Sequence, residues 1–219
     1  MTAAGSSTQG YAREASNLLK AYESISFRKA QASILRLLPR PPRRLLDIGA
    51  GTGRDAAGFA ALGYDVVATE PVAEMREGAR KLHPDRRIEW LDDSLPDLAR
   101  LSRRRERFDI IMMTAVWMHL DEDERRHGLK KITALLRPGG MLAISLRYGP
   151  VPPGRRMFAV TTGETIALAR AQGLVLLLKR DRPTLIPRAE PVTWKQLVFR
   201  RPQAQGFATL GQNGVLRLV

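Results

Sequence analysis

Short apolar runs alternate along most of this chain with segments whose apolar residues recur every three or four positions. The runs predict β-strands and the segments with helical spacing predict α-helices. The predicted strands cover residues 44–48, 65–69, 87–91, 108–113, 141–146 and 174–179. The predicted helices between them cover residues 54–62, 72–82, 95–103, 121–136 and 162–172. Such alternation is typical of an α/β fold with a parallel sheet and crossover helices on both faces.

The two ends of this pattern predict additional parts. Residues 11–38 have helical spacing and end at a proline-rich segment, so they predict one or two helices that cap the main fold. Residues 193–200 form a β-rich run with no helix before it, which predicts an antiparallel strand at or near the sheet edge. We therefore expect a doubly wound, mostly parallel sheet of seven strands. The predicted division is a helical extension at 1–40, a main domain at 41–201 and an unassigned tail at 202–219.

Composition narrows the chemistry. The chain has 219 residues, of which 44% are hydrophobic, so it can build a core. It has no Cys and only 3 His, namely His83, His119 and His127. Disulfides, thiolate metal sites and a cysteine nucleophile are therefore excluded, and no metal site is expected.

The charge balance allows two interpretations. Lys and Arg number 36 against 22 Asp and Glu, which gives a formal net charge of +14. Such an excess is typical of proteins that bind nucleic acid or acidic surfaces. The basic residues are spread along the chain rather than gathered in one tail, and this also fits an arginine bias of a GC-rich genome.

No segment predicts a membrane partner. The longest apolar stretches, at 110–113 and 174–178, fall far short of the roughly 20 residues that a spanning helix needs. The first ten residues contain neither a basic region nor an apolar run, so we expect a cytoplasmic protein.

The sharpest motif is Leu-Leu-Asp-Ile-Gly-Ala-Gly-Thr-Gly at residues 45–53, between a predicted strand and a predicted helix. Glycines there allow a tight turn and a close approach of the backbone to a ligand. A dinucleotide fingerprint would need its third glycine at position 54, where the chain has Arg54, so NAD and NADP are not expected to bind. Asp47 would repel a pyrophosphate but suits a ligand with an ammonium group, unless it only caps the turn.

On these residues the sequence resembles the Rossmann-like, class I S-adenosylmethionine-dependent methyltransferases, across about residues 40–200. The resemblance implies S-adenosylmethionine as cofactor, held by Asp47 and by the glycines Gly49, Gly51 and Gly53. It also implies that Glu70, which precedes Pro71 at the end of the second strand, binds both ribose hydroxyls. The alternative for Glu70 is a surface acid that begins a helix.

Two later landmarks extend the resemblance. Asp93 and Ser94 match the position that contacts the adenine ring, with Asp92 as a substitute, although an acid and a serine before a helix are also ordinary N-caps. After the fourth strand, Thr114 and Ala115 match residues that contact the cofactor.

The resemblance also places an acceptor pocket at this edge of the sheet. His119 is the predicted general base, with an orienting role in its loop as the alternative. Tyr11 is predicted to close the methionine end, unless its helix only packs on the sheet. The remaining predicted wall residues are Trp117, Arg147, Tyr148, Arg155 and Arg156, of which the arginines could equally be solvated loop charges.

We therefore expect an enzyme that transfers a methyl group to an oxygen or nitrogen of a small, flat or acid-bearing molecule. Methylation of RNA or DNA is the alternative that the charge of +14 suggests. Against it, the fourth strand lacks the Asn/Asp-Pro-Pro-aromatic motif of base amino-group methylation, and cytosine C5 chemistry needs a cysteine. A binding module without catalytic activity is a third reading.

Overall fold

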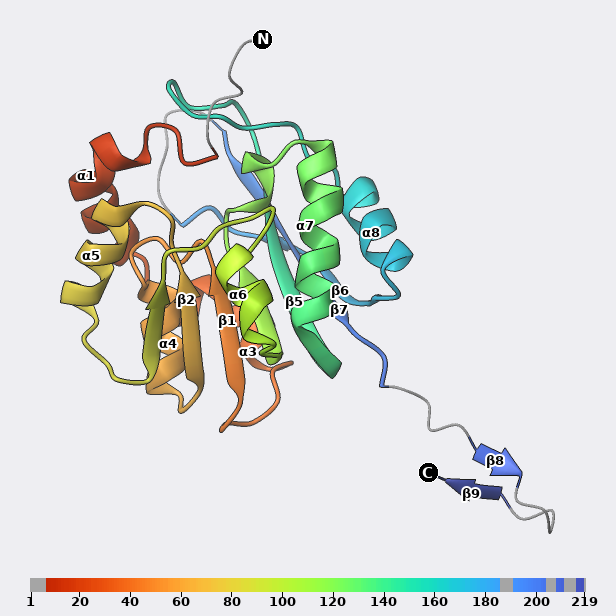
Figure 1. The fold of residues 1–219 in the computed structure, drawn as a ribbon. Coiled ribbons are helices and arrows are strands. Elements are labelled where there is room, and N and C mark those ends of the chain that lie inside the picture. The colour runs from red at the N-terminus through yellow and green to blue at the C-terminus, as the bar shows by residue number, and fades with distance from the viewer. Residues whose placement is uncertain (1–6, 186–190, 204–207, 211–215, 219) are drawn as a thin grey trace.

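A seven-stranded sheet forms the centre of the molecule, with helices on both faces (Figure 1). The computed structural model describes residues 7–185, 191–203, 208–210 and 216–218. In spatial order the strands are β3 (Ile88–Leu91), β2 (Asp65–Thr69), β1 (Arg44–Ile48), β4 (Phe108–Met113), β5 (Leu136–Tyr148), β7 (Thr193–Arg200) and β6 (Val175–Arg182). Strand β7 runs antiparallel to both of its neighbours, and the pairs from β3 to β5 are parallel. The predicted fold class is confirmed.

The helices divide between the two faces of the sheet. One face carries α2 (Phe27–Ala30), α3 (Ala32–Leu35), α4 (Arg54–Ala61) and α5 (Ala73–Leu82), with α1 (Tyr11–Glu23) packed on α5. The other face carries α6 (Ala99–Arg104), α7 (Glu122–Leu135) and α8 (Thr162–Ala171). Each face of the sheet has its own hydrophobic core, and alternate residues of β1 contribute to them. Leu46 packs with α6 and α7 on one face, and Leu45 packs with α4 on the other. A short hairpin, β8 (Ala208–Leu210) and β9 (Leu216–Leu218), follows in the tail.

Several predicted boundaries are wrong for physical reasons. Strand β5 begins at Leu136 rather than at residue 141, because Leu136 pairs with Phe108 of β4, Gly139 donates its amide to Arg201 O and Arg201 donates to Gly140 O. These bonds extend the strand into residues 139 and 140, which lie outside its predicted bounds. Residues 11–38 form three helices rather than one or two.

Capping residues set the ends of two helices. Asp121 and Glu124 form a capping box at the start of α7. The predicted helix at 95–103 begins only at Ala99, since Asp93 Oδ2 accepts the amide of Leu101 and Leu98 is left-handed at φ 45°.

No helix in the described ranges combines the length and the apolar character that crossing a bilayer requires. Within the same residues, His, Asp and Glu side chains form no group of three or more that could hold a metal ion.

Candidate functional site

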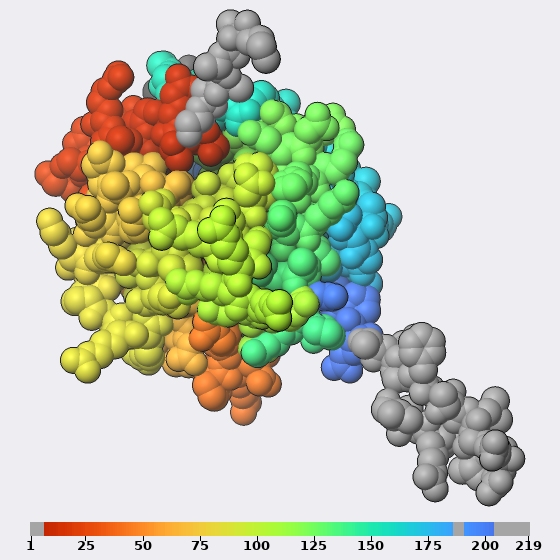
Figure 2. All heavy atoms as spheres, viewed as in Figure 1, coloured from red at the N-terminus to blue at the C-terminus, as the bar shows by residue number. Residues whose placement is uncertain are grey.

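A cavity of about 230 Å³ opens at the carboxyl ends of β1, β2, β3 and β4, where open α/β sheets bind ligands. An N-terminal segment, residues 7–23, which we call the strap, lies at this end of the molecule beside the loop at 149–161 (Figure 2). Ten predicted cofactor residues line the cavity: Tyr11, Asp47, Gly49, Gly51, Glu70, Pro71, Asp93, Ser94, Thr114 and Ala115. The predicted base, His119, lines it as well.

Glu70 and the glycine turn hold each other in place. Glu70 is buried, and its two carboxylate oxygens accept the amides of Gly51 (2.8 Å) and Val72 (2.9 Å). Burial raises the pKa of Glu70, and these two amides and Arg76 oppose that shift. The surface alternative for Glu70 is therefore wrong. Each oxygen retains a lone pair that a ligand hydroxyl can use.

Gly51 leaves room where a side chain would stand. Its φ is +58°, a conformation that favours glycine, and an added Cβ would reach only Met75 Cε at 3.9 Å. Gly53 has a different position, outside the cavity lining, as the N-cap of α4. A Cβ at Gly53 would stand 2.6 Å from the ring of Trp90, so the third glycine serves helix packing.

Asp47 is a buried carboxylate residue of the cavity wall. It is 2% exposed, and its Oδ2 has no hydrogen-bond partner within the part of the chain that the structure describes. Burial, then Asp55, raises the pKa of Asp47 well above its usual value. A buried carboxylate that lines a cavity and has one oxygen without a hydrogen-bond partner is suited to a cationic donor from a ligand.

Asp55 is a cavity residue that the sequence analysis missed. Its Oδ1 pairs with Arg54 (2.8 Å), and its Oδ2 accepts from Gln31 Nε2 (2.5 Å). The same amide nitrogen donates to Thr114 Oγ1 (3.2 Å), so Gln31 links α4 to the end of β4. The signal for Asp55 was its place directly after the glycine motif. Gln31 offered none, since a polar residue in a helix predicts exposure.

The predicted adenine position, Asp93 and Ser94, combines capping with cavity lining. Asp93 accepts the amides of Ser94 (3.1 Å) and Leu101 (2.9 Å), so it caps α6, as the alternative reading held. It also lines the cavity, whereas Asp92 is exposed and pairs with Arg76 and Arg100.

The turn after β4 has a strained backbone. Ala115 adopts φ +61°, which is rare for a residue with a Cβ, and its amide donates to Ser145 Oγ (2.8 Å). Residues held in sparse conformations cluster at functional sites, and this one lines the cavity.

His119 is fixed through both ring nitrogens. Its Nδ1 lies 2.9 Å from Arg156 O, which can only accept, so Nδ1 carries the proton. Burial lowers the pKa of His119, as do Arg155, Arg147 and Arg156. The neutral ring therefore accepts the hydroxyl of Tyr11 at Nε2 (3.0 Å). Burial raises the pKa of Tyr11, so its hydroxyl stays protonated.

Two arginines of the loop at 149–161 hold the strap and His119. Arg155 forms a bidentate pair with Glu14 (2.8 and 3.1 Å) and lies 4.2 Å from the Tyr11 ring centroid. Arg156 bonds Glu124 (2.8 Å), Asp121 (3.2 Å) and His119 O (2.9 Å). Neither lines the cavity, and their side chains are only 6% and 10% exposed. Arg155 and Arg156 are therefore neither acceptor-binding residues nor solvated charges. They hold the strap and the His119 turn in place through ion pairs and hydrogen bonds.

Three further wall predictions are wrong. Trp117 is fully buried in the core under α7, because the short helix η1 (Trp117–His119) turns it inward. Arg147 bonds Gly149 O, Tyr148 bonds Thr162 Oγ1, and neither lines the cavity.

The structure instead supplies Arg182 and Trp194 from the last two sheet strands. They lie opposite each other in the β6–β7 ladder. Arg182 stands in a basic run in which no local pattern distinguishes it from its neighbours, and Trp194 lies in a segment predicted only as a strand at or near the sheet edge.

Comparison with known proteins adds independent evidence. A family model described as methyltransferase domain matches residues 22–180. Demethylmenaquinone methyltransferase of Clavibacter sepedonicus is 34% identical over 130 residues, which are 57% of this chain and 50% of that protein. Cypemycin N-terminal methyltransferase of a Streptomyces species is 28% identical over 194 residues, covering 80% of this chain and 77% of that one.

A solved structure shows the same fold. The TehB-like SAM-dependent methyltransferase of Corynebacterium glutamicum has a TM-score of 0.63 and 25% identity, with 87% of this chain and 96% of that chain covered. The chain spans about half the length of the first curated relatives that it matches.

Proposed function

This chain belongs to the class I S-adenosylmethionine-dependent methyltransferases, and we propose from this premise that it methylates an oxygen or nitrogen of a small molecule. The relatives support both kinds of acceptor. One relative is named as a ubiquinone biosynthesis O-methyltransferase and another as a cypemycin N-terminal methyltransferase. A single cavity at the sheet edge receives both the predicted cofactor residues and the strap.

The family uses S-adenosylmethionine, whose sulfonium supplies an electrophilic methyl group. The residues present fit this cofactor. Asp47 Oδ2 lacks a partner among the described residues and suits the ammonium group, and Gly51 leaves open space beside it. Glu70 retains a lone pair on each oxygen for the ribose hydroxyls. Asp93 and Ser94 line the same cavity on the adenine side.

The chain's own contribution is proximity, orientation and exclusion of water, which are the main needs of an in-line methyl displacement. The strap supports this, because Ser7, Thr8 and Tyr11 line the cavity above the glycine turn. His119 positions Tyr11 rather than taking a proton. Its Nε2 is already engaged by the Tyr11 hydroxyl, and nearby arginines disfavour an imidazolium.

The unpartnered Oδ2 of Asp47, in a cavity that also contains Glu70, is the observation that carries the proposal. Calorimetry with S-adenosylhomocysteine tests it. We expect saturable binding to the wild type and at least about tenfold weaker binding to Asp47→Asn, because a neutral amide loses the charge-assisted bond. The exposed Asp181→Asn is the matched control. Absence of binding to the wild type would overturn the proposal.

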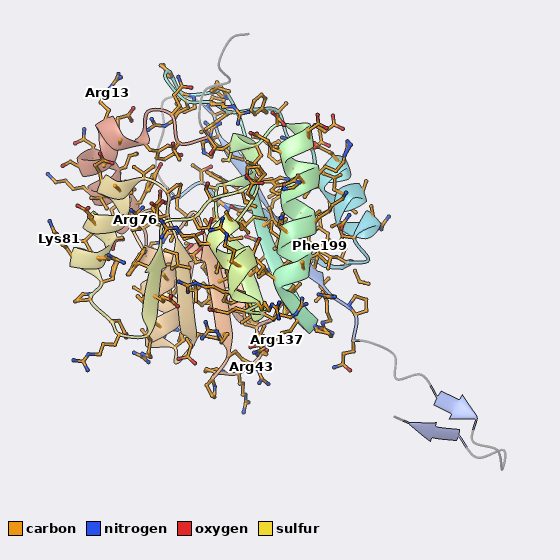
Figure 3. All side chains as sticks on the ribbon, in the orientation of Figure 1. Arg13, Arg43, Arg76, Lys81, Arg137 and Phe199 are labelled. Carbon is orange, nitrogen blue, oxygen red and sulfur yellow. The ribbon has the colours of Figure 1, made fainter. Side chains whose placement is uncertain are left out.

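RNA methylation remains a second candidate because of the net charge of +14. Figure 3 shows labelled basic side chains at separate places, with Arg13 and Lys81 beside α1 and α5 and Arg43 and Arg137 at the other end of the sheet. Filter binding with mixed RNA across a salt series separates the two functions. Salt-dependent affinity would favour RNA, and its absence would remove that candidate.

A further inference from the structure

Arg182 differs from the other arginine of the cavity in its partners. Arg54 is neutralised by Asp55 at 2.8 Å. Arg182 bonds only neutral oxygens, Gln196 Oε1 at 3.2 Å and the carbonyl of Ala30, and it forms no ion pair within the described ranges. A guanidinium has more N–H groups than these two acceptors use. Arg182 therefore places on the cavity wall a positive charge that has no carboxylate partner among the described residues.

A buried side chain fixes where this guanidinium lies. Gln196 is 1% exposed, and its Nε2 donates to Ile144 O (3.1 Å) and Leu197 O (3.2 Å). Its Oε1 is therefore turned towards Arg182. The bond to Ala30 holds the guanidinium from the other side. The charge is held in place before any ligand arrives, which lowers the entropic cost of binding.

The energetics favour an anionic ligand. Burial lowers the pKa of Arg182, which shows that its charge is desolvated, while Asp55 acts in the opposite direction and Arg54 in the same direction. A partly desolvated guanidinium gains most from a carboxylate, which matches its planar donors in a bidentate pair. Trp194, directly opposite in the ladder, adds an aromatic wall. The pair suits a flat molecule that bears an acid group.

We propose that Arg182 binds a carboxylate of the methyl acceptor, so that the enzyme methylates aromatic or other flat carboxylic acids. This inference rests on the proposed function and names the acceptor class of the same cavity. Asp47, the predicted ammonium ligand of the cofactor, lies in β1, and Glu70, the predicted ribose ligand, follows β2, whereas Arg182 and Trp194 come from β6 and β7.

The test compares benzoate with benzamide, which have nearly the same shape and differ in charge. Both are titrated into the protein saturated with S-adenosylhomocysteine, and binding is followed by calorimetry. We expect benzoate to bind about tenfold or more tightly than benzamide to the wild type. Arg182→Met should remove this preference, and Arg182→Lys should retain part of it. Arg180→Met, an exposed position on the same strand, should leave it unchanged.

A second set of measurements tests whether Arg182 binds the carboxylate of the cofactor instead of that of the acceptor. Affinities for S-adenosylhomocysteine and for 5′-methylthioadenosine, which lacks the amino-acid end, are measured in wild type and Arg182→Met. Unchanged affinities for both support the proposal. A loss of affinity for S-adenosylhomocysteine alone would assign Arg182 to the cofactor and overturn the proposal. The proposal is also overturned if the wild type binds neither benzoate nor benzamide, or binds both equally well. A failure of the proposed function is distinct, because the wild type would then not bind S-adenosylhomocysteine.

Discussion

The two halves of the cavity are built in different ways. The half at β1, β2 and β3 is held by carboxylates that accept backbone amides from the same or the neighbouring strand-helix unit, as when Glu70 accepts the amides of Val72, 2 residues away, and Gly51, 19 residues away. The half at the strap, β6 and β7 is held by side chains from distant segments, as when Arg155 binds Glu14. The first arrangement follows from local sequence, whereas the second exists only after the whole chain has folded. Mutations should therefore act locally in the first half and cooperatively in the second.

The largest expected effect is at Gly51. Gly51→Val should abolish measurable binding of S-adenosylhomocysteine, a loss above about 100-fold, because the side chain would occupy the ligand's space. Gly173→Val is the matched control, since Gly173 also has a positive φ and open surroundings but lies outside the cavity lining. Calorimetry and thermal unfolding of both variants separate lost binding from backbone strain. Equal losses in the two variants would refute the assignment.

Glu70 comes next. Glu70→Ala should weaken S-adenosylhomocysteine binding by about 2–4 kcal/mol, since it removes two charge-assisted bonds to the ligand. It should also lower the thermal midpoint, because two buried backbone amides lose their acceptor. An unchanged affinity measured by calorimetry would contradict the assignment of Glu70 to the cofactor.

Variants of His119 test the half of the cavity at the strap. His119→Ala should reduce stability and cofactor affinity together, by about 1–3 kcal/mol, because Tyr11 and Arg156 both lose a partner. His119→Gln, which can still accept from Tyr11, should recover part of both. A general base would behave differently: methyl transfer would fall about 10²–10⁴-fold with cofactor affinity unchanged. Transfer rates and calorimetry on both variants decide between the two roles.

The pH dependence of His119 sharpens the same point. Its folded pKa is lowered, so the unfolded chain takes up a proton first, at a pKa near 6.5. The stability that the neutral ring contributes is therefore present above about pH 6.5 and is lost as pH falls below it. Thermal midpoints of wild type and His119→Gln, measured from pH 8 to pH 5.5, should converge at the acidic end. A constant difference would contradict the neutral assignment.

The smallest effect is expected at Asp47 without ligand. Its raised pKa means that ionisation near neutral pH destabilises the fold, so Asp47→Asn should raise the thermal midpoint by about 2–4 °C. The same variant should bind S-adenosylhomocysteine less tightly. Gain of stability with loss of affinity is the signature of a group kept for its ligand. A lower midpoint measured by thermal unfolding would show that Asp47 serves the fold.

The sequence predicted which residues of the first half line the cavity, but it predicted few of the contacts in the second half. Asp47 and Glu70 end adjacent parallel strands, so their meeting at one edge follows from the fold class. Arg155 and Arg156 were read as acceptor or solvent charges, since only the fold shows that Glu14, Glu124 and Asp121 surround them. Trp117 was misplaced because a single turn of η1 decides which way its ring faces.

The strand predictions show the same division. Strands β1, β2, β4 and β7 have the predicted bounds, because their apolar runs end at clear polar or glycine positions. Strand β5 was predicted too short, since its first residues pair with Arg201, far along the chain. Local pattern predicts an element, and distant pairing sets its final length.

The place of β7 between β5 and β6 also bears on synthesis. Strand β6 leaves the ribosome before β7, yet its ladder partner within the described sheet is β7. Until residues 193–200 emerge, β5 and β6 both present open edges, which are sites of aggregation for nascent chains. Strands β1 to β4 carry the glycine turn and can pair earlier, while the Arg182–Trp194 pair is completed last. A stop codon before residue 193 would thus leave a chain that has its predicted cofactor residues but lacks the strand that pairs with both β5 and β6.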